Sequence, residues 1–340
     1  MILVTGAAGF IGHHLVKTLR DAGQSVLALV EPGQRLEHSP GPGLSVVEVD
    51  VGDRAAVLAL PPVEGTIHLA AIARLQYNKG DDEYERVNVQ GTQNLLDHAA
   101  ACKARRFVFV STIEAVGPAG GERPLVESDP PAPTNVYGRT KLEAEGRVIA
   151  ASRAGAVPGT VLRLPMVYGP GNTLIFSRLF KLAATGWYPR IGSRDVWMEF
   201  CNVHNAIHAM RLALERPEAV GEVFFINDGH SYKISEVLTA AAKAAGRERL
   251  RFVVIPERLA LLGGRGVELA AKLYPHPPLI TPLTKKPVFS RGTVAWTTKS
   301  VNWCSSEKAQ RLLGYRQQVP LEVGVAEAVA WYRAQGLLKG

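Results

Sequence analysis

The chain has 340 residues, of which 46% are hydrophobic and 21% charged, and its net charge at pH 7 is +8. This length and composition exclude a disordered or fibrous protein and predict one large domain or two closely associated ones. The cysteines, Cys102, Cys201 and Cys304, are far apart in the sequence and fit neither a disulfide framework nor a metal-binding motif. These features favour a reducing compartment.

The positive charge is concentrated in one region. Residues 243–316 hold 14 Lys and Arg against 4 acidic residues, whereas residues 1–242 hold 23 against 25. Hydrophobic segments separate the charges, so we expect no nucleic-acid partner, and a solvated basic face explains the charge as well as a binding surface does. With no secretion signal and no apolar run of about 18 residues, the sequence predicts a cytoplasmic protein.

Short runs rich in Val, Ile and Leu alternate with longer helix-like stretches through the first half of the chain. The runs are continuously apolar, as in a parallel sheet covered by helices on both faces. The sequence therefore predicts an α/β fold with a doubly wound parallel sheet. The expected strands are 1–4, 25–30, 44–49, 66–69, 106–110 and 160–164, and the expected helices are 10–22, 81–101 and 136–152.

A glycine-rich turn joins the first strand to the first helix in the sequence TGAAGFIG. Gly6 permits a tight turn, Gly9 lets the backbone approach a pyrophosphate, and Gly12 allows close packing of the helix. The free N–H groups at this helix start, around Phe10 and Ile11, favour an anion. The turn predicts a dinucleotide site, and the alternative is a glycine turn with no ligand.

The end of the second strand predicts which dinucleotide binds. Glu31 lies 19 residues after Gly12, where a carboxylate can accept hydrogen bonds from the ribose hydroxyls and would repel a 2′-phosphate. This favours NAD over NADP, although the nearby Arg35 leaves NADP open. After the third strand, Asp50 and Val51 either contact the adenine or form a turn.

A tyrosine and a lysine begin the helix expected at 136–152. Tyr137 and Lys141 are four residues apart and share one helix face. A lysine ammonium and a nicotinium charge could stabilise the tyrosine phenolate, which otherwise forms only near pH 10. The preceding strand ends in Ser111-Thr112 at the carboxyl edge of the sheet, where ligands of such folds bind.

Beyond Pro165 the pattern becomes less regular and predicts a smaller, mixed C-terminal lobe that binds substrate. We assign 1–165 to a dinucleotide-binding domain, to which 200–226 returns, and 166–199 with 227–340 to the substrate lobe. The elements expected after Pro165 are helices at 174–185, 234–245, 307–313 and 321–331, a strand at 222–226 and a Pro-rich stretch at 275–287.

Six motifs occur in the order and approximate spacing of the extended short-chain dehydrogenases/reductases, which the chain resembles over nearly its whole length. They are TGAAGFIG at 5–12, HLAA at 68–71, NVQGT at 88–92, STIEAVG at 111–117, YGRTK at 137–141 and LRLPMVYGPG at 162–171. The resemblance implies a Rossmann fold and an NAD-dependent oxidoreductase. It also implies that dimers are common.

The resemblance also implies roles for individual residues. Thr112 would hydrogen-bond the substrate oxygen, Tyr137 would act as acid and base, and Lys141 would hold the nicotinamide ribose. The residues expected to line the cofactor are Leu69, Ala70, Ala71 and Asn88, and for Asn88 packing between helix and sheet is an equal alternative.

Two departures separate this chain from the nucleotide-sugar enzymes of the family. Their dehydratases follow the threonine with an Asp-Glu pair, whereas this chain has Ile113-Glu114. Many also carry an arginine that neutralises the diphosphate, whereas Met198 stands at the matching position. Arg190 or Arg194 remain as substitutes. STIEAVGP and the tail at 303–315 instead resemble the 3β-hydroxysteroid dehydrogenase-like branch.

An insertion at 255–282 mixes leucines with Arg258, Arg265 and Lys272. It could cap a lipophilic substrate or, over 255–291, contact the inner face of a membrane. The alternative is an ordinary helix facing the core. His204, His208 and His230 show no metal-ligand spacing, so no metal is expected.

The leading hypothesis is an NAD-dependent oxidoreductase that interconverts a secondary alcohol and a ketone on an apolar molecule, such as a sterol or a 3-hydroxy acid, with decarboxylation left open. A nucleotide-sugar 4-epimerase with retained NAD is the second hypothesis. A dinucleotide-sensing scaffold without redox activity is the third. A homodimer is compatible with all three.

Overall fold

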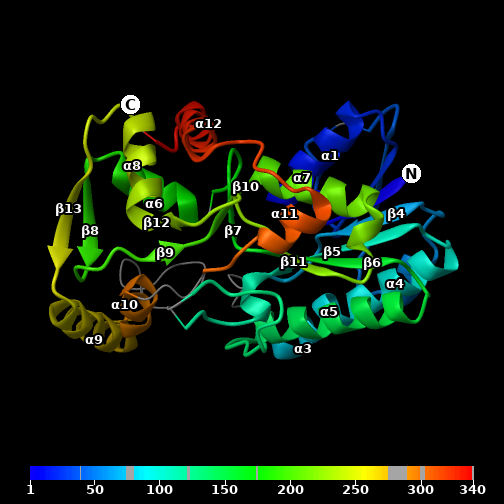
Figure 1. Ribbon diagram of the computed structural model, residues 1–340, viewed down its shortest axis with the longest axis horizontal. Helices are drawn as coiled ribbons and strands as arrows, with labels where there is room; N and C mark the ends of the chain where they lie inside the picture. Colours follow the sequence, from blue (N-terminus) through cyan, green and yellow to red (C-terminus); the bar gives the residue numbers. More distant parts are fainter. Residues whose placement is uncertain are drawn as a thin grey trace.

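The computed structural model describes residues 1–38, 40–73, 80–120, 123–173, 175–274, 289–298 and 303–338. The Pro-rich stretch predicted at 275–287 therefore lies outside the described residues. Figure 1 shows a large sheet with its helices on the right, which carries the N-terminus, and a smaller group of helices and short strands on the left.

Seven parallel strands form the main sheet. β1 lies between β2 and β4, so the strand order reverses beside β1, and the order across the sheet is β11-β6-β5-β4-β1-β2-β3. This confirms the predicted doubly wound sheet, whose ligands bind at the carboxyl ends of the strands near the reversal. The strands are β1 Ile2–Thr5, β2 Val26–Val30, β3 Leu44–Glu48, β4 Gly65–His68, β5 Arg106–Thr112, β6 Gly159–Leu164 and β11 Val223–Phe225.

Helices cover both faces of this sheet. α1 and α7 pack together on one face, and α2, α4 and α5 pack on the other. The sequence analysis did not identify α7, and the single helix expected at 81–101 is divided by a π-helical turn at Glu85–Gln90. The helices are α1 Phe10–Asp21, α2 Arg54–Leu58, α3 Asp81–Tyr84, α4 Gly91–Ala101, α5 Val136–Arg153 and α7 Val203–Glu215.

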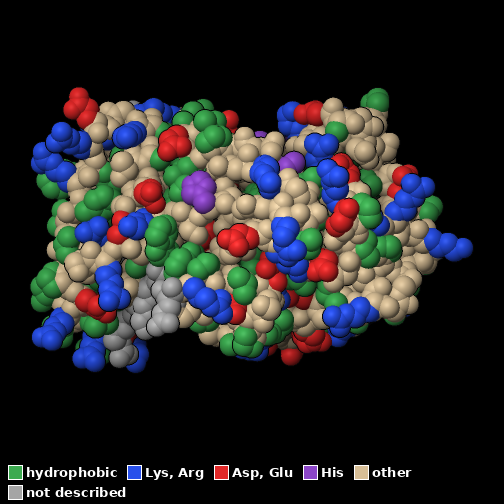
Figure 2. All heavy atoms as spheres, viewed as in Figure 1, with side chains coloured by type: hydrophobic (Ala, Val, Ile, Leu, Met, Phe, Trp, Pro, Cys, Tyr) green, Lys and Arg blue, Asp and Glu red, His purple; other side chains and the backbone are tan. Residues whose placement is uncertain are grey.

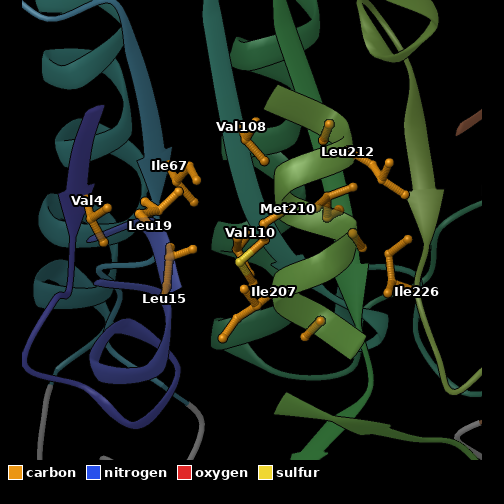
Figure 3. Close-up of a cluster of buried hydrophobic side chains, with 14 of the residues drawn as sticks. Val4, Leu15, Leu19, Ile67, Val108, Val110, Ile207, Met210, Leu212 and Ile226 are labelled. Carbon is orange, nitrogen blue, oxygen red and sulfur yellow. The ribbon is translucent and has the colours of Figure 1, made fainter. Parts of the chain in front are cut away.

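The apolar strands are buried because helices supply side chains to each face. In Figure 3, Leu15 and Leu19 of α1 lie beside Val4, while Ile207 and Met210 of α7 lie beside Val110. All of these side chains except Val110 are at most 2% exposed. Burial of this kind contributes about 1.5–3 kcal/mol for each large aliphatic side chain, and it fixes the strand ends that carry the candidate site.

The remaining elements form a less regular group with its own core. Aromatic side chains of α6, β10 and α12 meet in that core, including Phe176, Phe180, Phe200 and Tyr332. α11 instead packs against β11 at the edge of the main sheet. The elements are β7 Met166–Tyr168, α6 Ile175–Ala183, β8 Trp187–Ile191, β9 Trp197–Met198, β10 Phe200–Asn202, β12 Tyr232–Lys233, α8 Ile234–Ala244, β13 Arg251–Ile255, α9 Glu257–Leu273, α10 Arg291–Thr298, α11 Glu307–Leu313 and α12 Leu321–Ala334.

Figure 2, in the same view, shows Lys and Arg side chains gathered at the lower left corner, over α9. Part of the basic region at 243–316 therefore lies at one end of the molecule. None of the helices within the described ranges is long and apolar enough to cross a membrane.

Candidate active site

The turn between β1 and α1 is built for close approach of backbone to backbone. Gly6 has a φ of +65°, and a Cβ on Gly12 would lie 2.2 Å from the carbonyl oxygen of Gly6. Any side chain at position 12 would therefore displace the turn or the helix. The N-terminus of α1 is left open toward the strand ends, which is the geometry that a pyrophosphate requires.

A pocket of about 260 Å³ lies beside this turn. It brings together residues that the sequence analysis selected from four separate segments, and the geometry fits the adenosine half of a dinucleotide. The predicted cofactor residues among its lining are Gly6, Gly9, Glu31, Asp50, Val51, Leu69, Ala70 and Ala71. Phe10 instead lines a neighbouring pocket with Gly9, His13 and His14.

Two acidic side chains in the pocket have different surroundings. Glu31 is exposed and accepts a hydrogen bond of 2.8 Å from the Gln34 side-chain amide. Asp50 accepts one from the backbone N–H of Gly52 and pairs with Arg86 at 2.7 Å. Glu31 therefore keeps oxygens available for ribose hydroxyls, whereas Asp50 also holds its own turn. Gln34 and Arg86 line the pocket and were missed, because neither belongs to a local motif.

The loop after β4 is held by a buried polar chain. The Thr5 hydroxyl contacts His68 Nδ1 at 2.7 Å and accepts hydrogen bonds from the backbone N–H groups of Leu69 and Ala70. Burial lowers the pKa of His68 well below its ordinary value, so its ring stays neutral. Thr5 and His68 thus position the loop that lines the pocket. The HLAA motif predicted the lining residues of this loop but not the two side chains that hold it.

The Asn88 side chain is hydrogen-bonded to the backbone of that loop and to α5. Its side-chain oxygen accepts a hydrogen bond from Ile72 N, and its amide donates to Ile72 O and to the Thr140 hydroxyl. These bonds join the loop after β4 to α5. Asn88 is not among the residues that line the nucleotide pocket, and its contacts are those of the packing alternative.

Thr112, Tyr137 and Lys141 meet at the carboxyl end of β5. The Thr112 side chain lies close enough to the Tyr137 hydroxyl to oppose part of the rise in its pKa. Asn135 caps α5 by accepting from Gly138 N, and its amide donates to the Glu114 carboxylate. This arrangement fixes the first turn of α5 against the segment that follows β5.

Burial shifts the pKa values of Tyr137 and Lys141 in opposite directions. Burial, with a smaller contribution from Glu114, raises the pKa of Tyr137 above its ordinary value. Burial lowers the pKa of Lys141 to about 7, with Glu145 opposing this shift. The Lys141 ammonium donates to Val110 O at 2.7 Å and lies 3.9 Å from the centre of the Phe109 ring. Deprotonation of Tyr137 near neutral pH thus requires added positive charge beside it.

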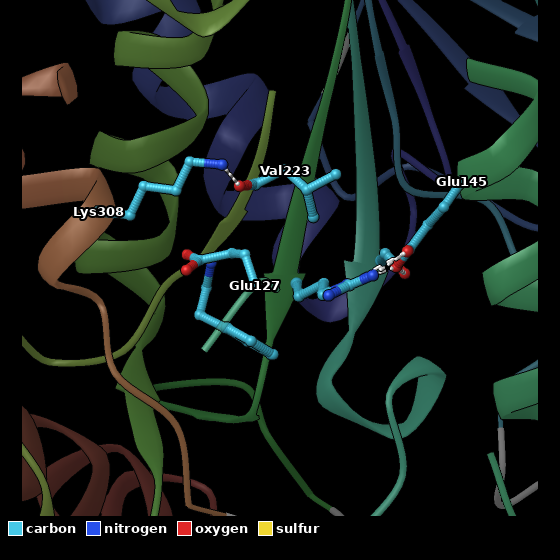
Figure 4. Close-up of polar contacts among 7 residues, drawn as sticks. Glu127, Glu145, Val223 and Lys308 are labelled. Carbon is cyan, nitrogen blue, oxygen red and sulfur yellow. Dashed lines mark hydrogen bonds and ion pairs between the residues drawn. The ribbon is translucent and has the colours of Figure 1, made fainter. Parts of the chain in front are cut away.

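A buried ion pair lies one helical turn beyond Lys141. Arg163 of β6 binds both oxygens of Glu145 from α5, at 2.7–3.1 Å, and the Ser111 hydroxyl donates to the same carboxylate at 2.5 Å. Figure 4 shows Glu145 with these dashed contacts, and Lys308 bound to the carbonyl of Val223 in the neighbouring strand. The ion pair ties α5, which carries Tyr137 and Lys141, to β6, and the Ser111 bond ties it to β5, which ends in Thr112.

The positions that depart from the nucleotide-sugar pattern are buried. Ile113 is 3% exposed, and Met198 is 2% exposed within the aromatic core of the smaller group of elements. Arg190 stacks over the Phe252 ring at 5.3 Å, and Arg194 lines a surface pocket beside Pro256. Met198 itself therefore offers no group to a diphosphate.

Histidines gather beside the glycine turn. The rings of His13 and His38 stack at 4.1 Å, and His14 contacts both His13 and His204 edge to face. His14 is hydrogen-bonded to Pro170 O. Among the described residues no group of three or more His, Cys, Asp or Glu could hold a metal ion.

Glu199 gives a testable pH dependence of stability. Burial raises its pKa to about 8, so the folded protein keeps a proton on Glu199 that the unfolded chain loses above about pH 4.5. Its contribution is therefore favourable in acid and is lost as the pH rises toward 8. Replacing Glu199 with Gln, which keeps an acceptor for Asn227, should stabilise the protein at pH 9 relative to pH 5 by about 1–3 kcal/mol.

Urea unfolding of both proteins at pH 5, 7 and 9 measures this difference. Glu248→Gln, at an exposed position, is the matched control and should leave the pH dependence unchanged. Parallel pH curves for wild type and Glu199→Gln would contradict the prediction.

Comparison with known proteins finds a matching family model and relatives that are dehydrogenases or reductases. The family model described as "NAD dependent epimerase/dehydratase family" matches residues 2–229. The chain is 28% identical to a 3-beta-hydroxysteroid dehydrogenase of Mycolicibacterium neoaurum over 97% of this chain and 91% of the relative. It is 30% identical to a 2-alkyl-3-oxoalkanoate reductase of Stenotrophomonas maltophilia, over 95% and 97%.

A second kind of relative acts on a nucleotide sugar. A UDP-glucose 4-epimerase of Vibrio cholerae is 30% identical over 72% of this chain and 75% of its own length. Among solved structures, the crystal structure of gox2253 superposes with a TM-score of 0.78 at 24% identity, covering 100% of this chain and 99% of that one. This structure shows the fold alone.

Proposed function

The chain belongs to the NAD-dependent epimerase/dehydratase family, and from this premise we propose that it interconverts a secondary alcohol and a ketone on an apolar small molecule. The resemblance to extended short-chain dehydrogenases/reductases is confirmed, and NAD is the cofactor of this family. The chemical class of the substrate and the roles of individual residues are our proposal.

One observation supports the proposal. Thr112 ends β5, Lys141 bonds to Val110 O of the same strand, and β5 pairs with β4, whose following loop lines the nucleotide pocket. A bound NAD would supply the acceptor for the hydride of the alcohol carbon, or in its reduced form the donor for the ketone. Tyr137 takes the hydroxyl proton as the hydride leaves, and Thr112 hydrogen-bonds the substrate oxygen. Lys141 contributes positive charge that favours the Tyr137 phenolate.

Two observations support an apolar substrate. Met198 is buried where an arginine would neutralise a diphosphate, and Ile113 replaces the acid that a dehydratase requires. In addition, two of the relatives that span nearly the whole chain are a hydroxysteroid dehydrogenase and a reductase of an oxoalkanoate. We propose a sterol-like alcohol or a 3-hydroxy acid. Loss of CO2 would follow oxidation only if the substrate carries a β-carboxylate.

The test is a thermal-shift screen in the presence of NAD. We expect hydroxysteroids or long-chain 3-hydroxy acids to raise the melting temperature and UDP, dTDP and GDP sugars to leave it unchanged, because an unpaired diphosphate would lose its solvation without compensation. Stabilisation at micromolar concentration by a nucleotide sugar alone would instead favour the 4-epimerase, for which the Vibrio relative provides the precedent.

The choice between dinucleotides is a separate prediction. NAD should bind at least tenfold more tightly than NADP, about 1.4 kcal/mol, because Glu31 would repel a 2′-phosphate. Titration of each dinucleotide against wild type and Glu31→Gln measures this, and the variant should narrow the difference. Arg35→Ala is the matched change in the same exposed loop. Tighter binding of NADP, lost in Arg35→Ala, would show that Arg35 determines the selectivity.

A further inference from the structure

α9 has two apolar faces, only one of which packs against the protein. Ala260, Gly264 and Ala271 are buried, and Ala260 contacts Ile191 of β8 and Val294 of α10. The leucines of the helix are not among these buried residues. Short side chains, with the partly buried Leu261 beside them, therefore attach α9 to the rest of the molecule, and the other four leucines of the helix are exposed.

The second face is a row of exposed leucines. Leu259, Leu262, Leu269 and Leu273 are spaced by three, seven and four residues, which places them along one side of a helix. Each is between 59% and 70% exposed, and Tyr274 at the helix end is 71% exposed. We call these five residues the leucine row. An exposed apolar row of this length marks a binding surface.

A row of cations runs beside the leucine row. Arg258, Arg265 and Lys272 are seven residues apart and all exposed. The acids of α9, Glu257 and Glu268, lie beyond these cations on the side away from the leucines. Within the described part of the chain, no ion pair involves any of the three cations. Figure 2 shows this corner of the molecule rich in Lys and Arg.

We propose that α9 binds the surface of a bilayer that contains anionic phospholipid. Apolar side chains with an aromatic residue at the end and cations alongside are the composition of helices that lie in the membrane interface. Anionic headgroups would pair with these three cations, which form no ion pair within the residues that the structure describes. A second copy of the same face would not supply the opposite charge, because the leucine row and its cationic flank contain no carboxylate.

This inference sharpens the contact expected over 255–291 to one face of one helix, and it does not depend on the proposed reaction. Leucines of α9 would enter the acyl boundary while the cations stay at the headgroups. Each cation near an anionic surface contributes roughly fivefold in affinity. Binding should therefore weaken with salt and with loss of anionic lipid.

The experiment is co-sedimentation of the full chain with large vesicles of phosphatidylcholine, with and without 40 mol% phosphatidylglycerol. We expect binding to the anionic vesicles at low salt and at least tenfold weaker partitioning to phosphatidylcholine alone. L262Q/L269Q should reduce binding to anionic vesicles at least tenfold, and R258Q/R265Q/K272Q should remove the preference for anionic lipid. Val323→Gln, at an exposed apolar position on α12, is the matched control and should bind like wild type.

Melting temperature and NAD affinity of each variant establish that the fold is intact, since the substituted side chains are exposed. Absence of wild-type binding to anionic vesicles would overturn the proposal, as would equal binding by L262Q/L269Q. A wild-type dimer that L262Q/L269Q converts to monomer, without vesicle binding, would make the leucine row an interface between copies and would also overturn it. None of these readouts measures turnover, so failure here leaves the proposed reaction unaffected.

Discussion

Replacing Tyr137 with phenylalanine should lower kcat by a factor of about 10²–10⁴ while changing the Kd for NAD less than threefold. The hydroxyl is the group that moves the proton, and the Thr112 side chain lies beside it and favours its ionised form. The ring remains to pack at the start of α5, so the dinucleotide pocket should keep its shape. Steady-state kinetics with the substrate found in the screen, together with NAD titration, measures both quantities.

The control for this variant is Tyr84→Phe, which removes a hydroxyl that donates to the Ala73 carbonyl beside the same loop. It should change kcat less than tenfold. A Tyr137→Phe enzyme that keeps more than about a hundredth of the wild-type rate would refute the assignment of Tyr137 as acid and base. Wild-type protein that binds NAD but turns over no member of the panel would favour the sensing scaffold.

The sequence predicts the fold and the candidate site best where residues close together in the chain determine the geometry. Gly12 must be glycine because its backbone contacts Gly6 and Ala7 within the same turn, so this part of the motif contains its own geometry. Gly6 also approaches the backbone of Leu69 and Ala70, a contact that only the fold reveals. Tyr137 and Lys141 share a helix face, and the strand before them ends at Thr112. In the structure Thr112 ends β5, and Lys141 bonds to the Val110 carbonyl of the same strand.

The elements that the sequence analysis missed depend on contacts between distant segments. α7 follows directly from β10, and Asn202 caps its first turn. The helix packs against α1, which is distant in the sequence, and this contact is not visible in the local pattern of residues 203–215. Asn88 looked equally suited to cofactor contact and to packing, because only the fold shows that its partners are Ile72 and Thr140. The leucine row on α9 has the spacing of a core-facing helix, and exposure is not encoded in that spacing.

Replacing Arg163 with methionine should destabilise the protein by about 3–5 kcal/mol, because it leaves the Glu145 carboxylate buried without its cation. Arg163 and Glu145 are 6% and 3% exposed, so water cannot replace the lost bonds. Among the described residues, only Ser111 would remain as a hydrogen-bond partner of Glu145. Urea unfolding at pH 7.5 measures the loss, which should be smaller at pH 5, where the unpaired carboxylate takes up a proton more readily.

The double variant E145M/R163M distinguishes a buried charge from simple loss of packing. With both ions removed, the cost of desolvating them also disappears, and in the wild type one Arg163 nitrogen, Nη1, is buried without a partner. We therefore expect the free energy of unfolding of the double variant to be within about 2 kcal/mol of the wild-type value and higher than that of either single variant. Arg147→Met, which breaks a more exposed pair with Glu143, is the control and should cost less than about 1 kcal/mol. If the two single losses instead added in the double variant, the pair would act through packing alone. The ion pair would then not be what holds α5, with Tyr137 and Lys141, against the sheet.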